Sequence, residues 1–401
     1  MRILAVIAAL MLAACSSSPE INSTEPASLP DFDKEVSLDH VWSAQVGKGM
    51  GEGFARLNPA SDGKTLYLAD AEGELQAREL ASGHLIYRLN IDMQITGGLL
   101  LDGDSLYLSN GDGDMVALNA ADGSVKWQKR LTSEVMALPA ISGNDLLVQT
   151  VDGKLHLLDK TDGRNKWSYD SNMPLLSLRG TSSPVIYRDQ AIAGFANGKV
   201  VGLNMANGQP LWEERIGIPA GRSELERLVD IDGRLLVDND LLYVVGYQGS
   251  LEVIDLRTGR PQWKKDASSY AGPLYGLGNL YVLDADDQLH AFDDRGGNDV
   301  WQQNGLYRRQ LTEPVFFNNL IAVADAEGYI HLIKQLDGAI VGRDRVKRPA
   351  LDWVAADSYD FRHPTRYFDL DPGIRTRLNV VGDYLVAINN AGFVNIFQLD
   401  Q

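Results

Sequence analysis

The chain has 401 residues, of which 44% are hydrophobic and 23% charged, so it can bury a large core. Its formal net charge of -17 argues against binding to nucleic acid, because neutralising phosphates requires a basic face. The same charge disfavours electrostatic docking on anionic lipid and favours partners that carry basic patches.

The first fourteen residues, MRILAVIAALMLAA, predict a signal peptide. The charged start at Arg2 precedes an apolar run that ends at Leu12 and is too short to span a bilayer. The segment continues into LAAC, and Cys15 is the only cysteine of the chain. A lone thiol suits a lipid anchor better than a disulfide framework.

The LAAC sequence resembles the lipobox of bacterial lipoproteins. This resemblance implies cleavage after Ala14 and a lipid on Cys15, with palmitate among its acyl chains. Residue Ser16 stands where Asp would retain such a lipoprotein at the inner membrane, which implies sorting to the outer membrane. The alternative is an ordinary signal peptide with an incidental cysteine.

After the cysteine, residues 16–38 are rich in Ser, Pro and acidic residues (SSSPEINSTEPASLPDFDKEVSL). Such a composition predicts a flexible tether. We therefore expect a signal peptide over residues 1–14, a lipidated cysteine and linker over 15–38, and a folded domain over 39–401.

One phrase recurs through the folded domain. It reads NAADGSVKW (119–127), DKTDGRNKW (159–167), NMANGQPLW (204–212), DLRTGRPQW (255–263) and DDRGGNDVW (293–301), with weaker copies around Gly83 and Gly338. An alternating apolar hairpin with a glycine-bearing turn precedes each copy, and eight such hairpins occur. Four strands in a repeat of about 40–45 residues are typical of a propeller blade.

The sequence thus predicts an all-β, eight-bladed β-propeller, with a tandem solenoid as the alternative fold. The last hairpin ends the chain without a fourth strand, whereas HVWSAQVG (40–47) precedes the first hairpin and places Trp42 at the recurring tryptophan position. We expect this N-terminal strand to complete the last blade and close the ring. Each recurring tryptophan should pack between neighbouring blades.

The recurring phrase resembles the tryptophan-docking motif of quinoprotein (PQQ-like) propellers, which invites an enzymatic interpretation. Quinoprotein dehydrogenases use a calcium-bound quinone, a catalytic carboxylate and, in many, a vicinal cysteine pair that a single cysteine cannot form. The six histidines show no metal-ligand spacing such as H-x-x-x-H. We therefore expect no catalytic residues, cofactor or metal.

Function is expected where the connections exceed what a turn requires. Two consecutive connections, after Trp167 and Trp212, take 24 and 29 residues to reach the next hairpin, where four others take 17 to 19. Both should emerge on the same face as neighbours. The first contains LLSLRG (175–180) and the second GRSELERLVDID (221–232), which would join exposed leucines to charged residues, as in a protein interface. The alternative is that Leu176 and Leu178 point inward from a strand while Arg179 pairs with a nearby aspartate.

With its lipobox, linker and eight blades, the whole chain resembles the BamB family, lipoprotein subunits of the bacterial outer-membrane β-barrel assembly machinery. Its most specific segments are LSLRG and SELERLVDID. The resemblance implies that this surface docks on the periplasmic POTRA domains of BamA, through Leu176, Leu178, Arg179, Asp230 and Asp232.

The resemblance further implies a non-enzymatic scaffold at the periplasmic face of the outer membrane. It would contact other subunits indirectly and assist the folding and insertion of barrel precursors. Two alternatives are a quinoprotein-type propeller enzyme and an independent holdase that binds unfolded precursors directly. Residues 347–378 form an insertion without a family counterpart, and its aromatic residues predict a packed flap between the seventh and eighth blades, away from the BamA site.

Overall fold

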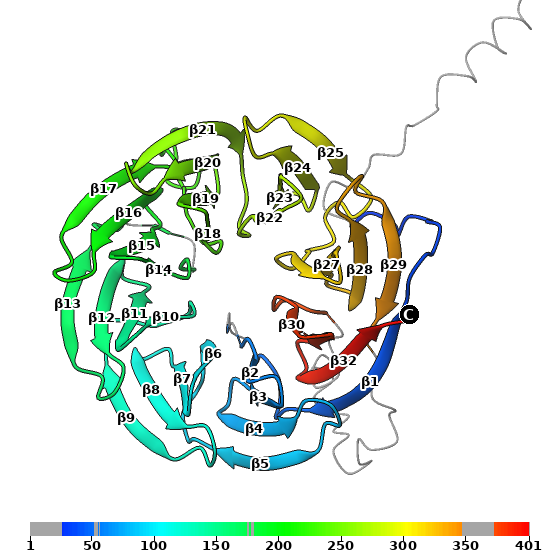
Figure 1. Cartoon of the computed structure of the whole chain (residues 1–401), viewed down its shortest axis with the longest axis horizontal. Helices are drawn as coiled ribbons and strands as arrows, with labels where there is room; N and C mark the ends of the chain where they lie inside the picture. Colours follow the sequence, from blue (N-terminus) through cyan, green and yellow to red (C-terminus); the bar gives the residue numbers. More distant parts are fainter. Residues whose placement is uncertain are drawn as a thin grey trace, which may run out of the picture.

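A computed structural model of the chain describes residues 26–51, 55, 57–174, 176–177, 180–346 and 373–400. Within these ranges the 32 strands form eight sheets of four strands each. Figure 1 shows the sheets arranged as blades around a central axis. The predicted eight-bladed propeller is therefore confirmed. None of the described residues belongs to a helix long and apolar enough to cross a membrane.

The first strand of each blade lies nearest the axis, and all of them except β6 have only two or three residues. These strands are β2 (Ala60–Ser61), β6 (Gly97–Asp102), β10 (Ala140–Ser142), β14 (Val185–Tyr187), β18 (Leu236–Asp238), β22 (Leu274–Gly276), β26 (Val315–Phe317) and β30 (Asn379–Val381). The second strands are β3 (Thr65–Ala69), β7 (Ser105–Ser109), β11 (Asp145–Thr150), β15 (Gln190–Gly194), β19 (Leu241–Val245), β23 (Asn279–Leu283), β27 (Leu320–Ala324) and β31 (Tyr384–Ile388).

The third and fourth strands lie toward the rim. The third strands are β4 (Glu74–Glu79), β8 (Asp114–Asn119), β12 (Lys154–Asp159), β16 (Lys199–Asn204), β20 (Gly249–Asp255), β24 (Leu289–Asp293), β28 (Tyr329–Lys334) and β32 (Phe393–Leu399). The fourth strands are β5 (Leu85–Asn90), β9 (Val125–Arg130), β13 (Asn165–Asp170), β17 (Pro210–Arg215), β21 (Arg260–Ala267), β25 (Asp299–Gln303), β29 (Ile340–Arg345) and β1 (Leu38–Gln45).

The eighth blade joins the two ends of the chain. Its strand order is β1-β32-β31-β30, and β1 pairs antiparallel with β32 from Leu38 opposite Leu399 to Gln45 opposite Phe393. The prediction that the N-terminal strand closes the ring is therefore confirmed. This closure replaces the open ends of a linear array with one more blade-to-blade contact.

Burial follows the position of each strand in its blade. Strand β11 is buried along nearly its whole length, because neighbouring blades cover both of its faces, whereas β13 alternates between exposed and half-buried residues. This difference explains why the second and third strands appear as continuous apolar runs in the sequence. In the fourth strands polar and apolar residues alternate, because only one face of these strands is covered.

The recurring tryptophan holds adjacent blades together, as predicted. Trp127 of the second blade lies over Gly163 of the third, where a Cβ would come within 2.8 Å of Trp127 Cε3. Its indole N–H donates to the carbonyl of Lys160 at 2.9 Å. The same donation to the next blade is made by Trp42, Trp167, Trp263 and Trp301. The junction of the fourth and fifth blades differs, because Gln190 of the fourth blade stands between the two partners. Its side-chain oxygen accepts from the indole N–H of Trp212, and its side-chain nitrogen donates to the carbonyl of Leu256 in the fifth blade.

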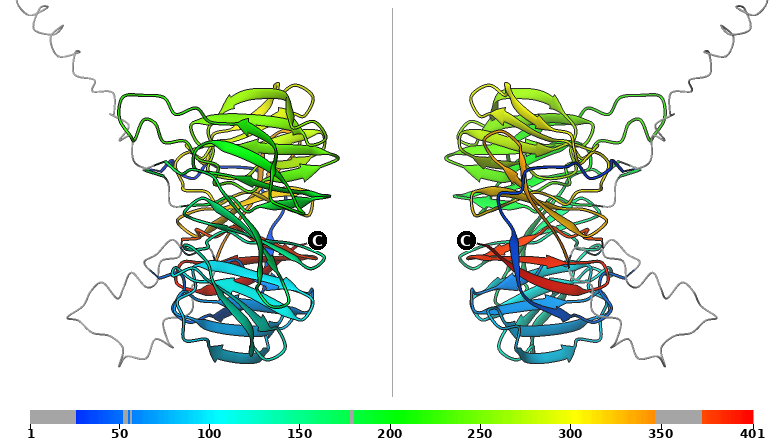
Figure 2. Two further views of the ribbon diagram at one scale, coloured as in Figure 1. Left: turned by 90° about the vertical axis from the view of Figure 1, so that its left-hand side faces the viewer. Right: turned by 90° about the vertical axis from the view of Figure 1, so that its right-hand side faces the viewer.

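Because successive strands are antiparallel, the connections divide between two faces of the ring. The connections between blades and the turns between second and third strands share one face, called here the loop face. The remaining turns lie on the opposite face, called the turn face. Figure 2 shows a long green connection projecting from the loop face, while the C-terminus lies on the other side.

The described part of the predicted linker, residues 26–37, is bound along the seventh blade. The N–H groups of Glu35 and Val36 both donate to the carbonyl of Val341, and the N–H of Ala27 donates to the carbonyl of Tyr307. Composition alone did not predict this attachment. The predicted signal peptide and Cys15 lie outside the described residues.

Candidate partner-binding face

The two long connections lie side by side on the loop face. The first joins β13 to β14 and the second joins β17 to β18, so they flank the fourth blade. They touch where Gly180 meets Asp232, since a Cβ on this glycine would come within 2.1 Å of Asp232 Oδ1. A small cavity beside this contact is lined by Met173, Gly180 and Asp230. The expected proximity of the two segments is therefore present.

The first connection is held at both ends by the inner part of the fourth blade. At its start, the side-chain amide of Asn197 donates to the hydroxyl of Ser171 at 3.0 Å. At its end, the hydroxyl of Ser182 donates to the carbonyl of Gly194 and accepts from its N–H, both at 3.1 Å. Both ends of the first connection are thus fixed to the fourth blade.

Glycines on the fourth blade make room for the second connection. Ile231 packs against Gly194, where a Cβ would come within 2.5 Å of Ile231 Cγ2, and Val229 covers Gly198 in the same way at 3.0 Å. Between these two side chains, the carbonyl of Asp230 accepts from the N–H of Tyr247 at 2.7 Å. This segment therefore crosses the junction of the fourth and fifth blades as a buried strand-like ribbon.

The tip of the second connection is a compact turn. Ser223 and Glu226 exchange hydrogen bonds as in a capping box: the N–H of Glu226 donates to Ser223 Oγ at 3.2 Å, and the N–H of Ser223 donates to Glu226 Oε2 at 3.3 Å. The N–H of Arg222 also donates to this carboxylate, and these backbone donors lower the pKa of Glu226. The turn lifts Leu225 into solvent, where it is 69% exposed.

The predicted binding residues fall into three groups. Leu176 is 42% exposed and lies in no strand, which argues against an inward-pointing strand at this position. Residues Leu178 and Arg179 lie outside the described residues. Asp230 and Asp232 are 1% and 7% exposed, so they differ from the exposed charges expected from the sequence. The physical reason is that Val229 and Ile231 draw this segment into the blade junction, placing both aspartates beneath the first connection.

Two exposed apolar residues were missed by the sequence analysis. Ile218, at the start of the second connection, is 70% exposed, and Leu225 is equally open to solvent. With Leu176 they give both connections apolar side chains that no blade covers. The sequence did contain a signal for Leu225. This leucine lies among charged residues in the middle of the second connection, where no strand periodicity directs an apolar side chain into a core.

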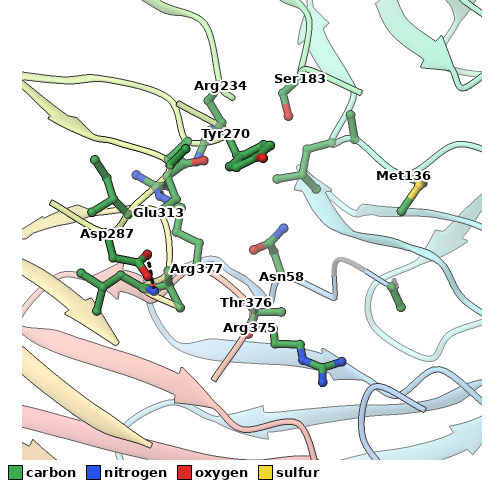
Figure 3. Close-up of a pocket in the computed structure, with 18 of the residues that line it drawn as sticks. Asn58, Met136, Ser183, Arg234, Tyr270, Asp287, Glu313, Arg375, Thr376 and Arg377 are labelled. Carbon is green, nitrogen blue, oxygen red and sulfur yellow. Dashed lines mark hydrogen bonds and ion pairs between the residues drawn. The ribbon is translucent and has the colours of Figure 1, made fainter. Parts of the chain in front are cut away.

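A cavity of about 250 Å³ opens on the loop face at the axis of the ring. Figure 3 shows Arg234 and Arg375 approaching it from opposite sides, with Glu313 and Arg377 between. Arg377 Nε lies 3.1 Å from Glu313 Oε1, and burial lowers the pKa of Arg377 despite this carboxylate. The cavity is thus lined both by residues that follow the insertion and by Arg234, near the end of the second long connection.

Two histidines occupy equivalent positions in the third strands of the sixth and seventh blades. His290 Nε2 lies 2.8 Å from Asp284 Oδ2, and His331 Nε2 lies 3.1 Å from Asp325 Oδ2. Each aspartate precedes its histidine by six residues across the hairpin turn. These pairs support the hairpins, and within the described ranges no three His, Cys, Asp or Glu side chains gather as metal ligands.

Comparison with known proteins gives a consistent result. Residues 71–303 match the family described as "Outer membrane protein assembly factor BamB". The chain is 48% identical over 384 residues to a protein of that name from Pseudomonas aeruginosa, covering 96% of this chain and 95% of the relative. It is 32% identical over 365 residues to the protein of that name from Escherichia coli, covering 88% and 93%.

Solved structures show the same fold. The crystal structure of BamB from Moraxella catarrhalis superposes with a TM-score of 0.78 at 26% identity, covering 90% of this chain and 99% of that one. A quinohemoprotein alcohol dehydrogenase from Comamonas testosteroni superposes with a TM-score of 0.67 at 11% identity, covering 90% and 76%. The second likeness shows the propeller fold alone.

Proposed function

Because this chain belongs to the BamB family of outer membrane protein assembly factors, we propose that it is a non-enzymatic scaffold that binds the periplasmic POTRA region of BamA. As a family member it is a component of the machinery that assembles outer-membrane proteins. The proposed role is to hold the periplasmic arm of that machinery while barrel precursors fold and insert into the membrane.

The contact between Gly180 and Asp232 carries this proposal. It locks the two long connections into one surface, so that the exposed side chains of both can meet a single partner. Leu176, Ile218 and Leu225 supply apolar anchors, and the charged residues of the 222–227 turn surround them. Apolar anchors within a polar rim are typical of protein interfaces.

The buried aspartates would act indirectly in this interface. Asp232 contacts Gly180, and Asp230 lines a small cavity with the same glycine. Gly180 directly follows Leu178 and Arg179 in the sequence, so we assign both aspartates the role of positioning that segment. The direct contacts would then come from Leu176, Leu178 and Arg179. A rigid support for a short recognition segment limits the ordering entropy that binding must overcome.

We also propose that the protein is held at the periplasmic face of the outer membrane by a lipid on Cys15. The names of the relatives support the location at the outer membrane. The lone cysteine within LAAC supports the anchor. An anchored scaffold would meet the periplasmic region of BamA without a membrane-spanning segment of its own.

Capture of the purified periplasmic region of BamA tests the proposed interface. Leu176→Ala, Leu178→Ala and Arg179→Ala should each weaken capture by about 2 kcal/mol or more if they are anchors, with little change in melting temperature. Leu336→Ala is the matched control, because Leu336 is 78% exposed on the turn face. A large loss of stability with capture intact, or an equal loss of capture in the control, would contradict the proposal.

A further inference from the structure

Residues 26–37, called here the strap, cross the seventh blade from the loop face to the turn face. At the loop face, the N–H of Ala27 donates to the carbonyl of Tyr307, in the connection between the sixth and seventh blades. At the other end, the carbonyl of Ser37 accepts from the N–H of Asp400 at 2.9 Å, just beyond the end of β32. Figure 2 shows this dark-blue segment passing from one face to the other.

A buried arginine holds the loop-face end of the strap. Arg309 Nε lies 2.8 Å from Asp325 Oδ2 with both side chains buried, and Glu327 binds a second nitrogen of the same guanidinium. The remaining terminal nitrogen donates to the carbonyl of Ala27 at 2.8 Å. Because two carboxylates also bind this guanidinium, its orientation toward the carbonyl of Ala27 is held by contacts that do not involve the strap.

A second arginine holds the middle of the strap. Arg343 donates to the carbonyl of Pro30 at 3.0 Å, and its guanidinium carbon lies 4.8 Å from the centre of the Phe32 ring. Phe32 packs against the apolar core between the sixth and seventh blades, and Val36 packs against the core of the eighth-blade junction. The strap is therefore attached by hydrogen bonds, a cation–π contact and apolar packing along most of its length.

We propose that the strap determines which face of the propeller is turned to the membrane, and that this is the loop face. The inference rests on the proposed lipid anchor at Cys15. In the bound state, the first contact that the structure describes between the strap and the blades is that of Ala27, on the loop face. If the strap were released, the chain would leave at Leu38, beside the turn face. The contacts of Arg309 and Arg343 thus move the point of attachment from one face to the other.

The short chain between Cys15 and the strap limits which face of the propeller can approach the bilayer. Twelve residues separate Cys15 from Ala27, and even a fully extended chain of this length spans only about 40 Å. Passing back around a blade, whose six-residue strands are about 20 Å long, would consume much of that span. Release of the strap would extend the link to 23 residues, or about 80 Å, and either face could then approach the bilayer.

This orientation would place the partner-binding connections on the membrane side of the ring. The proposed docking surface and the bound end of the strap share the loop face, although they lie on different blades. A partner whose membrane-embedded part sits in the same bilayer would find this surface directed toward it. Orienting a tethered surface in this way raises its effective concentration near the partner without adding a contact.

Energy transfer from a fluorophore to a dye in the lipid headgroups measures the orientation. The lipidated protein is reconstituted in phosphatidylethanolamine–phosphatidylglycerol vesicles after labelling a single introduced cysteine, either Asp112→Cys on the loop face or Ala121→Cys on the turn face of the same blade. We expect higher transfer from position 112. Equal transfer, or higher transfer from position 121, would overturn the proposal.

Strap variants supply the second arm of the experiment. Phe32→Ala combined with Arg343→Ala should abolish the difference between the two labels and speed trypsin cleavage after Lys34. Arg345→Ala is the control, since Arg345 lies on the same strand but contacts Glu327 and Tyr329 rather than the strap. A difference that survives in a folded, rapidly cleaved double variant would overturn the role of the strap.

The two proposals can fail separately. A wild-type protein that stays in the supernatant when vesicles are sedimented would overturn the lipid anchor and the orientation together. A protein that sediments with vesicles but shows equal transfer at both labels would overturn the orientation alone. Capture of the BamA periplasmic region in solution, which needs no membrane, is independent of both results.

Discussion

Gly180 lies directly against the carboxylate of Asp232, and no side chain larger than hydrogen fits at this glycine without displacing it. The two residues come from different connections, 52 positions apart in the sequence. Their contact converts two long loops into one supported surface. In the proposed interface, Asp232 would therefore influence binding by supporting the first connection and not by touching the partner.

Substitution of this glycine tests that relationship. Gly180→Ala should displace the segment carrying Leu178 and Arg179 and reduce capture of the BamA periplasmic region. The melting temperature should change little, because Gly180 lies in the connection between β13 and β14 and not in a strand of a blade. Gly111→Ala is the control on the same face, since its nearest neighbour to a new Cβ is 3.6 Å away. Unchanged capture by a folded Gly180→Ala protein would show that the segment tolerates the shift.

Blade-to-blade packing can be tested with a matched pair of glycines in the third blade. Gly163 and Gly143 both have left-handed φ angles, of 73° and 57°, but only Gly163 faces a tryptophan. Alanine at either position should lower the free energy of unfolding by about 1–2 kcal/mol, because its backbone is strained at this φ. Gly163→Ala should lower it by about 1–3 kcal/mol more, because the new methyl group overpacks against Trp127. Urea unfolding measures the difference, and equal losses would contradict the packing role of Trp127.

Stability should decrease as the pH falls through the range in which histidine titrates. Burial lowers the pKa of His331 below its ordinary value of 6.5, although Asp325 acts in the opposite direction. Below about pH 6.5, the unfolded chain therefore binds a proton that the folded protein resists, and the free energy of unfolding declines. The same holds for His156, whose pKa is also lowered by burial.

Replacing the buried histidine should flatten this dependence. His331→Gln should show a smaller change in urea midpoint between pH 7.5 and pH 5.5 than the unsubstituted protein. His84→Gln is the control, because His84 is exposed on a turn. An unaltered slope in His331→Gln would mean that another group dominates the titration.

The insertion should be dispensable for BamA binding, but its end must be kept. Residues 347–372 lie outside the described residues, whereas Ile374 is 1% exposed and its N–H donates to the carbonyl of Asp325. A Gly-Ser turn in place of residues 350–372 should therefore leave the protein folded and capture intact. A deletion continuing to Arg375, as the sequence alone would suggest, should lower the melting temperature. Lost capture by a cooperatively melting 350–372 variant would make the insertion part of the docking surface.

The lipid anchor makes a further prediction about localisation. Cys15→Ala should yield a soluble periplasmic protein that folds normally, because the residue stands twelve positions before Ala27, which makes the first contact among the described residues. Fractionation of cells lacking BamA gives the measurement. Membrane association of the variant under these conditions would show that a second attachment exists.

Much of the architecture followed from the sequence. The glycine and the tryptophan recur because each repeat has the same two requirements. The turn needs a residue with a left-handed φ, and the tryptophan of the neighbouring blade packs where that residue would carry a Cβ. The period therefore revealed the eight blades, and the tryptophan on the first strand revealed ring closure. The length of the connections also located the candidate binding face, because surplus residues between fixed strands must emerge together.

The exposure of individual site residues depended on the tertiary structure. In the sequence, Asp230 and Asp232 belong to a charged stretch, and nothing local distinguishes them from Glu224 or Arg227. Their burial arises because Gly194 and Gly198, more than thirty residues away, leave room for Ile231 and Val229, which carry the segment into the blade junction. A contact between distant segments cannot be read from the composition of either one.

The attachment of the strap could not be predicted from the sequence either. By itself the sequence determined that residues 16–38 are polar, proline-rich and short of core-forming side chains, and it determined the distance from Cys15 to the first blade. Only the tertiary structure decided that part of this segment is bound, because Arg309 and Arg343 follow it by some 280 and 310 residues. Their guanidinium groups satisfy carbonyls that a free linker would leave to water.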